Sequence, residues 1–242
     1  MNDIKDPIGY HTLGLLSGAD NYNRWMFKTL APFCSGNILE IGSGVGNISE
    51  CLLENFENVT LSDLRSEYCE VLHKRFDKSD SLEGIHKIDL VETEFEKSYN
   101  HLFNKFDTII ALNVIEHIKD DSLAINNCKK LLKEDGKLIV LVPAYQCLYN
   151  QMDSMLEHYR RYSQKKLKSL LKNEGMINIH SQYFNAAGIL GWWLTGSFFN
   201  HKTIPEKNIN LFNKLVFLFK IIDIILFYKI GLSVLVVAKN KV

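Results

Sequence analysis

The chain has 242 residues, 28 basic against 28 acidic side chains, and no formal net charge. This length suits one α/β domain with an appendage, and the charge balance argues against nucleic acid as a main partner, because nucleic-acid binders carry basic surfaces. The five cysteines form no C-x-x-C pair, which favours a reducing, cytoplasmic setting. No secretory signal pattern and no run of 18 apolar residues is visible, so we expect no membrane-spanning helix.

Residues 1–36 predict an N-terminal helical cap rich in aromatic side chains, ended by Pro32 and Gly36. Residues 37–242 then alternate strand and helix patterns, which predicts a mostly parallel sheet with helices on both faces. The expected strands are 37–41, 58–63, 84–89, 106–112, 137–143, 177–184 and 232–239. The expected helices include 47–56, 66–76 and 164–173. We expect Gly136 to end the helix before the fifth strand.

The first expected strand runs into a glycine-rich turn. Glu40 precedes Gly42, Gly44 and Gly46 in the order E-x-G-x-G-x-G. Glycine lets the backbone turn tightly and lie against a ligand. The spacing differs from the G-x-G-x-x-G of dinucleotide enzymes, and the acidic residue suits a cationic amino-acid head group. A strand-to-helix turn without a ligand is the alternative interpretation.

Two further carboxylates follow expected strands. Asp63 ends the second strand, where it could accept both hydroxyls of a ribose. Its alternative role is to cap the helix that begins near Arg65. Asp89 ends the third strand, where it could hold an adenine amino group or simply lie in solvent.

The order of these motifs, followed by the run F-D-T-I-I-A-L-N-V-I-E-H-I at 106–118, resembles the class I S-adenosylmethionine-dependent methyltransferases. The resemblance covers roughly residues 20–185 and the last strand. It implies an α/β, Rossmann-like, seven-stranded sheet of order 3-2-1-4-5-7-6 with strand 7 antiparallel. It also implies S-adenosylmethionine as the cofactor and S-adenosylhomocysteine as the product.

In this family Glu40 and the glycine turn would face the methionine end of the cofactor, Asp63 the ribose, Asp89 the adenine and Asn113 the sulfonium. The full set of cofactor contacts that the resemblance implies is Tyr22, Glu40, Gly42, Ser43, Gly44, Gly46, Asp63, Leu64, Asp89, Leu90 and Asn113.

The fourth-strand motif lacks (Asp/Asn)-Pro-Pro-(Tyr/Phe) and resembles the small-molecule branch of the family. Some ubiquinone-pathway O-methyltransferases carry Glu-x-x-Glu-His and bind a divalent cation there. This chain keeps Glu116 and His117 but has Asn113 in place of the first glutamate, so we expect no metal. His117 and His158 are candidate general bases. For His117, packing or capping of the next helix is the alternative.

The run D-S-M-L-E-H-Y-R-R-Y-S at 153–163 follows the fifth strand. A bacterial branch of these methyltransferases resembles this chain in H-Y-R-R-Y-S and in a later G-W-W. Guanidinium groups bind carboxylates and phosphates, and tyrosines provide aromatic walls. The alternative is a salt-bridged helix start with Ser163 as the N-cap. The expected acceptor contacts are Tyr145, Tyr159, Arg160, Arg161 and Trp192.

The segment 186–230 forms an apolar, partly helical insert between the last two strands. It could be a substrate lid, a homodimer face or a peripheral membrane contact. The expected activity is methyl transfer to a small, partly apolar acceptor (aromatic, isoprenoid or lipid-like), with oxygen favoured over nitrogen or carbon, as in small-molecule or natural-product biosynthesis. The alternatives are a non-catalytic methyltransferase-fold subunit of a partner enzyme and a nicotinamide oxidoreductase.

Overall fold

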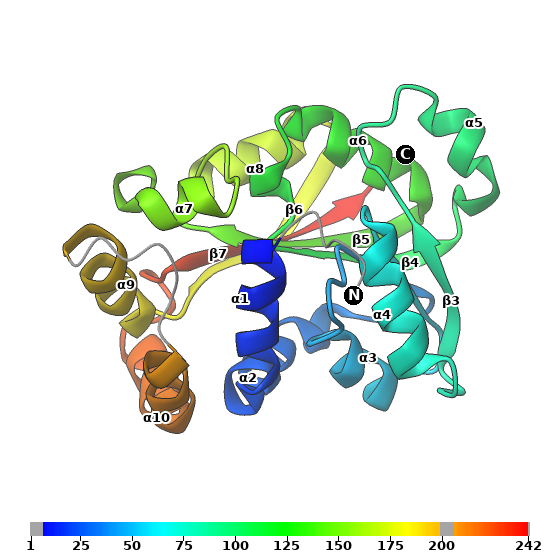
Figure 1. The fold of residues 1–242 in the computed structure, drawn as a ribbon. Helices are drawn as coiled ribbons and strands as arrows, with labels where there is room; N and C mark the ends of the chain where they lie inside the picture. The colour runs from blue at the N-terminus through cyan, green and yellow to red at the C-terminus, as the bar shows by residue number, and fades with distance from the viewer. Residues whose placement is uncertain (1–6, 199–205, 242) are drawn as a thin grey trace.

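The structure is a computed structural model that describes residues 7–198 and 206–241 (Figure 1). A seven-stranded sheet forms its centre, in the order β3-β2-β1-β4-β5-β7-β6. β7 pairs antiparallel with β5 and β6, and the other neighbouring pairs are parallel. The fold class and strand order expected from the resemblance are therefore confirmed. The strands are β1 Ile38–Ile41, β2 Val59–Asp63, β3 Leu82–Lys87, β4 Phe106–Leu112, β5 Leu132–Pro143, β6 Met176–Phe184 and β7 Ser233–Asn240.

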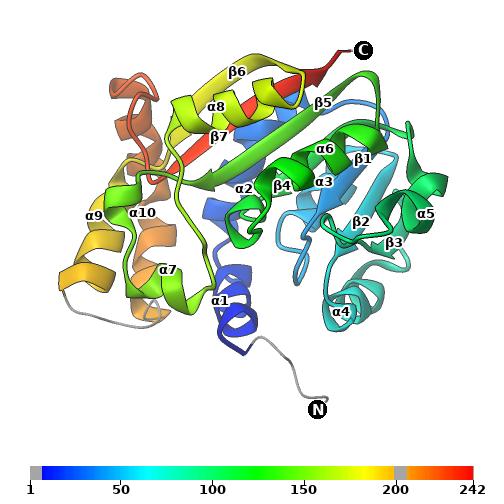
Figure 2. The same ribbon diagram turned by 90° about the horizontal axis from the view of Figure 1, so that it is seen from above.

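Helices cover both faces of the sheet (Figures 1 and 2). Side chains alternate along a strand, so Ile109 and Ile110 in β4 point to opposite cores. One core is closed by α5, α6 and α8, and the other by α2, α3, α4 and α10. The helices are α1 Pro7–Ser17, α2 Asp20–Leu30, α3 Ser49–Asn55, α4 Ser66–Phe76, α5 Phe95–Tyr99, α6 Asp121–Leu131, α7 Gln151–Met155, α8 Gln164–Asn173, α9 Ala187–Trp192 and α10 Glu206–Ile225.

The register of the central strands brings the functional turns together. Ile41 at the end of β1 lies opposite Ser62 in β2 and Ala111 in β4. The residues that follow these three parallel strands therefore meet at the carboxyl edge of the sheet. Open α/β sheets bind their ligands at this edge. This edge carries the glycine turn, Asp63 and the turn after β4.

The helix α1 lies over the glycine turn. Its Leu13 carbonyl accepts a hydrogen bond of 3.0 Å from the Asn47 side chain, and its Tyr10 ring stacks on Tyr68 of α4 at 6.2 Å. None of its residues is buried. We infer that α1 adds little to the core and packs over the glycine turn, where a Cβ on Gly44 would meet Leu13.

The buried acidic residue of the apolar helix α10, Asp223, has a structural explanation. Asp223 is buried, and its two carboxylate oxygens accept from the backbone N–H groups of Asn185 and Ala186 at 2.7 and 2.8 Å. This pairing ties α10 to the chain just after β6. Buried polar groups are stable only when they are paired in this way.

Two expected boundaries differ from the structure. Gly136 does not end a helix: α6 ends at Leu131, and 133–136 form an irregular part of β5 in which Asp135 takes the positive φ of 63°. The strand starts early because Leu132 already lies opposite Phe106 of β4. The third strand also ends at Lys87, two residues before Asp89.

Candidate active site

The glycine turn is built from backbone conformations that side chains disfavour. Gly42 and Gly44 have φ values of 71° and 55°, and a Cβ on Gly42 would collide with Val114 in the turn after β4. The Gly44 N–H donates to Asp63 Oδ2 at 3.0 Å, and the Arg65 N–H donates to Asp63 Oδ1 at 2.9 Å. The Asp63 carboxylate therefore links the turn to the end of β2. It does not cap the next helix, because the N-cap of α4 is Arg65 and that helix has no side-chain cap.

Two buried carboxyl groups lie beside this turn. Glu40 is 4% exposed and accepts a hydrogen bond from the Ser49 hydroxyl. Burial raises the pKa of Glu40 to about 7, against the lowering effect of Ser49 and Ser43. Burial also raises the pKa of Asp63, and the N–H groups of Arg65 and Gly44 oppose the rise. Such desolvated carboxylates fit an ammonium group and ribose hydroxyls, and the glycines let Val114 and Leu13 pack directly against the backbone of the turn.

The other expected cofactor contacts surround this edge of the sheet. Ser43 is buried and its N–H donates to the Ser62 carbonyl at 2.8 Å, whereas Leu64 is 49% exposed. Asn113 is exposed, with a positive φ of 53° at the turn after β4. Its backbone N–H donates to Leu141 at 2.8 Å, so the backbone there is fixed while the side chain faces solvent.

The candidate adenine contacts lie beyond β3. Asp89 is half-buried, and its Oδ1 accepts from the Val91 N–H at 2.9 Å. Leu90 is buried, and its carbonyl accepts from the Asn127 side chain at 2.9 Å. These bonds fix the loop that follows the strand.

Tyr22, another expected cofactor contact, packs against β6 and α10. Its ring packs against Phe184 at the end of β6 and Phe212 of α10, with centroid distances of 6.0 and 5.6 Å. Its backbone N–H donates to the Asn213 side chain at 3.1 Å. The described contacts of Tyr22 thus join α2 to α10.

The turn after β4 meets the loop after α7 at a cluster of titratable groups. The rings of His117 and His158 lie edge to face at 4.6 Å. Glu116 joins them, and one ligand atom from each of the three lies within 4.8 Å of the others. Within the described part of the chain, these are the residues whose geometry could hold a metal ion. The Glu116 carbonyl accepts from the Tyr159 N–H at 2.8 Å, which holds the two loops together.

Glu116 is fully buried, and no described residue gives either of its carboxylate oxygens a hydrogen bond. Burial raises the pKa of Glu116 to about 8, against the lowering effect of the Arg161 charge. A buried carboxyl group without partners is rare in proteins and requires an explanation.

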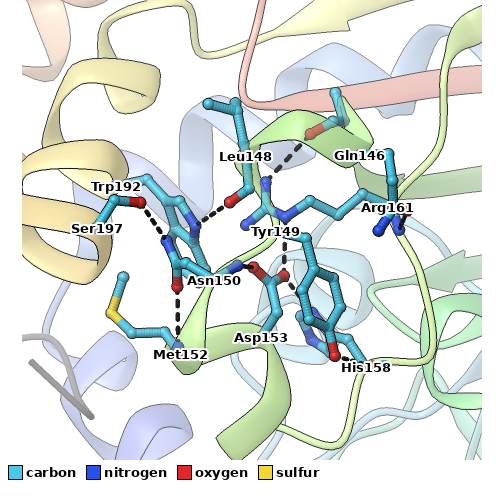
Figure 3. A network of polar contacts seen from close by, with 11 residues as sticks. Gln146, Leu148, Tyr149, Asn150, Met152, Asp153, His158, Arg161, Trp192 and Ser197 are labelled. Atoms are coloured by element: carbon cyan, nitrogen blue, oxygen red, sulfur yellow. Dashed lines mark hydrogen bonds and ion pairs between the residues drawn. The ribbon is translucent and has the colours of Figure 1, made fainter. Parts of the chain in front are cut away.

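Asp153 fixes the orientation of His158 (Figure 3). Its Oδ1 accepts from His158 Nδ1 and from Arg161 Nε, both at 2.8 Å, and its Oδ2 accepts from the Asn150 N–H at 3.0 Å. Burial alone would raise the pKa of Asp153, but the bonds from His158 and Arg161 outweigh it and hold that pKa below its usual range. With Nδ1 donating to a carboxylate, Nε2 of His158 is the nitrogen left to accept a proton or bind an ion.

The two arginines are paired within the chain. Arg161 is 2% exposed, bonds Asp153, and stacks over the Trp192 ring at 4.6 Å. Arg160 forms an ion pair of 2.7 Å with Asp121 and donates to the Lys119 carbonyl. We expected both guanidinium groups to meet an acidic acceptor. The structure instead gives them partners that order the loop carrying His158.

The remaining expected acceptor contacts differ in exposure. Tyr159 is 56% exposed, while Tyr145 stacks on Tyr183 with centroids 5.1 Å apart. Trp192 donates from Nε1 to the Leu148 carbonyl at 3.3 Å. Ser163 accepts from the Lys166 N–H at 3.2 Å, which confirms it as the N-cap of α8.

An open apolar hollow of about 440 Å³ lies beside Leu148, close to the Trp192 contact. Its lining is almost entirely aliphatic and aromatic and comes from the chain after β6 and the end of α10. The lining residues are Leu148, Ala186, Ala187, Ile189, Leu190, Trp193, Ile222, Leu226 and Ile230.

Two residues of the cluster were missed as site candidates in the sequence. Glu116 was visible as part of the Glu-His pair after the fourth strand, but a single carboxylate gave no sign that it would be buried without partners. Asp153 lies in the first turn of the short helix α7, five residues before His158 in the loop that follows. No periodic pattern marks a contact of that kind, and the loop's fold alone creates it.

The acidic glycine turn and the sheet with an antiparallel β7 define a class I S-adenosylmethionine-dependent methyltransferase. The chain matches the sequence model of the methyltransferase domain family over residues 19–192, and it belongs to that family. As a member of this class its cofactor is S-adenosylmethionine. Of the solved neighbours, one contains S-adenosylmethionine and another S-adenosylhomocysteine.

Several known proteins are similar to parts of the chain. A ubiquinone biosynthesis O-methyltransferase of Actinobacillus pleuropneumoniae is 33% identical over 105 residues, which cover 42% of this chain and 43% of the relative. A probable polyketide synthase 42 of Dictyostelium discoideum is 28% identical over 145 residues, or 51% of this chain and 5% of the relative. The chain thus spans less than half the length of these curated relatives.

Solved structures share the fold at low sequence identity. A chain of the complex between the Haloferax volcanii Trm112 methyltransferase activator and a methyltransferase has a TM-score of 0.64 at 12% identity, with 99% of this chain and 100% of that chain covered. Phosphoethanolamine N-methyltransferase 2 of Haemonchus contortus, solved with S-adenosylmethionine, has a TM-score of 0.59 at 20% identity. The match covers 92% of this chain and 53% of that chain.

Proposed function

We propose that the protein transfers the methyl group to an oxygen atom of a small, partly apolar acceptor. The observation that carries the choice of oxygen is the buried bond of 2.8 Å between Asp153 and His158, beside His117. A hydroxyl must lose its proton as it is methylated, and an oriented imidazole cluster provides a general base. The O-methyltransferase among the relatives agrees with this choice.

The reaction is an in-line displacement at carbon. S-adenosylmethionine supplies a methyl group already activated by its sulfonium. The acceptor oxygen forms the new O–CH3 bond while the S–CH3 bond breaks, its electron pair goes to sulfur, and the hydroxyl proton goes to the His117–His158 cluster. Glu40, Asp63 and the glycine turn would hold the cofactor, and alignment of the reactants supplies a large share of the rate enhancement.

The acceptor is proposed to be aromatic, isoprenoid or lipid-like because of the apolar hollow beside Leu148. The stacked Arg161–Trp192 pair connects this hollow with the loop that carries His158. An apolar tail could lie in the hollow while the reacting hydroxyl lies at the histidines. In this arrangement Arg161 positions the loop rather than binding the acceptor.

The outer surface of the insert is proposed to meet a membrane surface. The second half of α10 exposes apolar side chains, and the acid within 207–231, Asp223, is buried. Aromatic and aliphatic residues with flanking cations suit an anionic bilayer surface. Among the described residues, no helix is long and apolar enough to cross a bilayer. The exposed side chains are Phe217, Leu218, Ile221, Ile222, Ile224 and Ile225, and the lysines are at 207, 214, 220 and 229.

Vesicle flotation tests this contact, with Phe217→Asp as the variant. We expect binding to anionic vesicles that the variant loses, and a monomer by light scattering. A second copy of the chain is the alternative partner. A dimer that Phe217→Asp dissociates, without any vesicle binding, would replace the membrane contact with a homodimer face.

The chemistry is tested by incubating the protein with labelled S-adenosylmethionine and a panel of phenols, isoprenoid alcohols and matching amines. We expect label in methyl ethers, and His117→Ala and His158→Ala each slower by about 10²–10⁴-fold. The matched control is His73→Ala, an exposed histidine of α4 paired with Asp77. Transfer to the amines alone, or wild-type rates in both variants, would refute the proposed oxygen chemistry.

A further inference from the structure

We propose that Glu116, His117 and His158 bind a divalent first-row transition-metal ion. Two of the three side chains come from the turn after β4 and the third from the loop after α7, and their ligand atoms lie within 4.8 Å of one another. The sequence predicts no metal here because Asn113 replaces the first glutamate of the Glu-x-x-Glu-His motif; in the structure the loop histidine supplies the third ligand instead.

The buried carboxylate is the first independent observation. Glu116 is fully buried, and both oxygens lack a hydrogen-bond donor among the described residues. Leaving two buried oxygens unpaired is costly, and native structures avoid it unless an ion, a water or a catalytic role explains it. A cation beside the two imidazoles would satisfy this carboxylate directly.

The orientation of His158 is the second observation. Asp153 accepts from His158 Nδ1 at 2.8 Å and is itself held by Arg161 and Asn150, as Figure 3 shows. Metal-binding histidines commonly donate their other nitrogen to a carboxylate, which fixes the tautomer and the ring direction. Asp153 is fully buried, so this support is rigid before any ion arrives.

A base without an ion explains less of the geometry. The Asp153–His158 pair alone would suffice to orient an imidazole base, and Glu116 would have no role beside it. A three-ligand cluster uses the two histidines and Glu116 together, with Asp153 as the support. This inference deepens the proposed function: an ion held there would act as a Lewis acid that acidifies a bound acceptor hydroxyl, and the hydroxyl proton would then leave to water, because the imidazole nitrogens that face the acceptor would be coordinated.

The ligand types decide which ion fits. Two imidazoles and one carboxylate suit Zn²⁺, Co²⁺ or Fe²⁺, whereas Mg²⁺ and Ca²⁺ prefer oxygen ligands. Tetrahedral Zn²⁺ with bonds of about 2.0–2.1 Å needs ligand atoms about 3.4 Å apart. His117 is exposed and can close this gap by rotating its side chain, while Glu116 and His158 are buried and stay in place.

The test measures binding of the metal alone to the full chain, without cofactor or acceptor. Protein treated with a chelator is titrated with Co²⁺, followed by its visible absorption, and Zn²⁺ is then added in competition. We expect one ion per chain. His117→Asn, His158→Asn and Glu116→Gln should each weaken binding at least about tenfold, whereas the exposed control His73→Asn should not.

Asp153→Asn should weaken binding about 10- to 100-fold, because it removes the support of His158 without removing a ligand. If this variant unfolds, His117→Asn decides the question, since His117 is exposed and outside the core. No stoichiometric ion, or binding unchanged in both His117→Asn and His158→Asn, would overturn the metal site. Methyl transfer by protein that binds no metal would leave the proposed function standing, so the two proposals fail separately.

Discussion

Cofactor affinity should depend on pH through Glu40. This carboxyl group is 4% exposed, and burial raises its pKa to about 7. A cationic amino-acid head group binds the ionised carboxylate, so below pH 7 the Glu40 carboxyl group must lose its proton before the cofactor can bind. With that pKa about one-tenth of the protein is ionised at pH 6 and about nine-tenths at pH 8, and each unit of pKa corresponds to 1.36 kcal/mol. The dissociation constant should therefore be about tenfold lower at pH 8 than at pH 6.

Calorimetry with S-adenosylhomocysteine at pH 6, 7 and 8 measures this dependence, and circular dichroism at each pH shows that the fold is intact. Glu40→Gln is the matched variant, because it keeps the shape and removes the titration. We expect weaker binding that is flat with pH over this range. Equal affinity of the wild type at pH 6 and pH 8, or the same slope in Glu40→Gln, would refute the assignment of Glu40 to the head group.

Two stability predictions follow from buried pairing and backbone strain. Asp153→Ala leaves Arg161 as an uncompensated charge that is 2% exposed, so urea unfolding should show a loss of about 3–5 kcal/mol, against less than about 1 kcal/mol for the exposed Asp77→Ala. Similar losses from both would contradict the network. Gly42→Ala should cost about 1–3 kcal/mol because of its φ of 71°, whereas Gly14→Ala, with open space in α1, should be neutral or slightly stabilising. A neutral Gly42→Ala would argue against a strained turn.

The regular parts of the fold could be predicted because their signals are local. The helices 66–76 and 164–173 match α4 and α8 residue for residue, since each has an apolar face with a defined start and end. The strand order came from the resemblance rather than from periodicity. Gly136 misled the prediction, because strand pairing at Leu132 overrode the glycine as a helix stop.

The histidine cluster could be predicted only in part. His117 and His158 were candidates by residue type, but their approach to 4.6 Å depends on how the loop after α7 folds onto the turn after β4. The role of Arg161 could not be predicted from the sequence either. An arginine that meets a substrate and one that meets a buried aspartate look identical in a sequence, and only the burial of Asp153 distinguishes them.

The most direct test of the account is a titration of the purified wild type and Asp63→Ala with S-adenosylmethionine. The Asp63 carboxylate accepts hydrogen bonds from the N–H groups of Gly44 and Arg65. Replacing it with alanine removes these bonds to the turn and also removes the proposed acceptor for the ribose hydroxyls. We predict a dissociation constant on the order of micromolar for the wild type, and a loss of binding in a variant that remains folded. A folded wild type that binds no cofactor would contradict the central claim, as would an Asp63→Ala variant that binds with unchanged affinity.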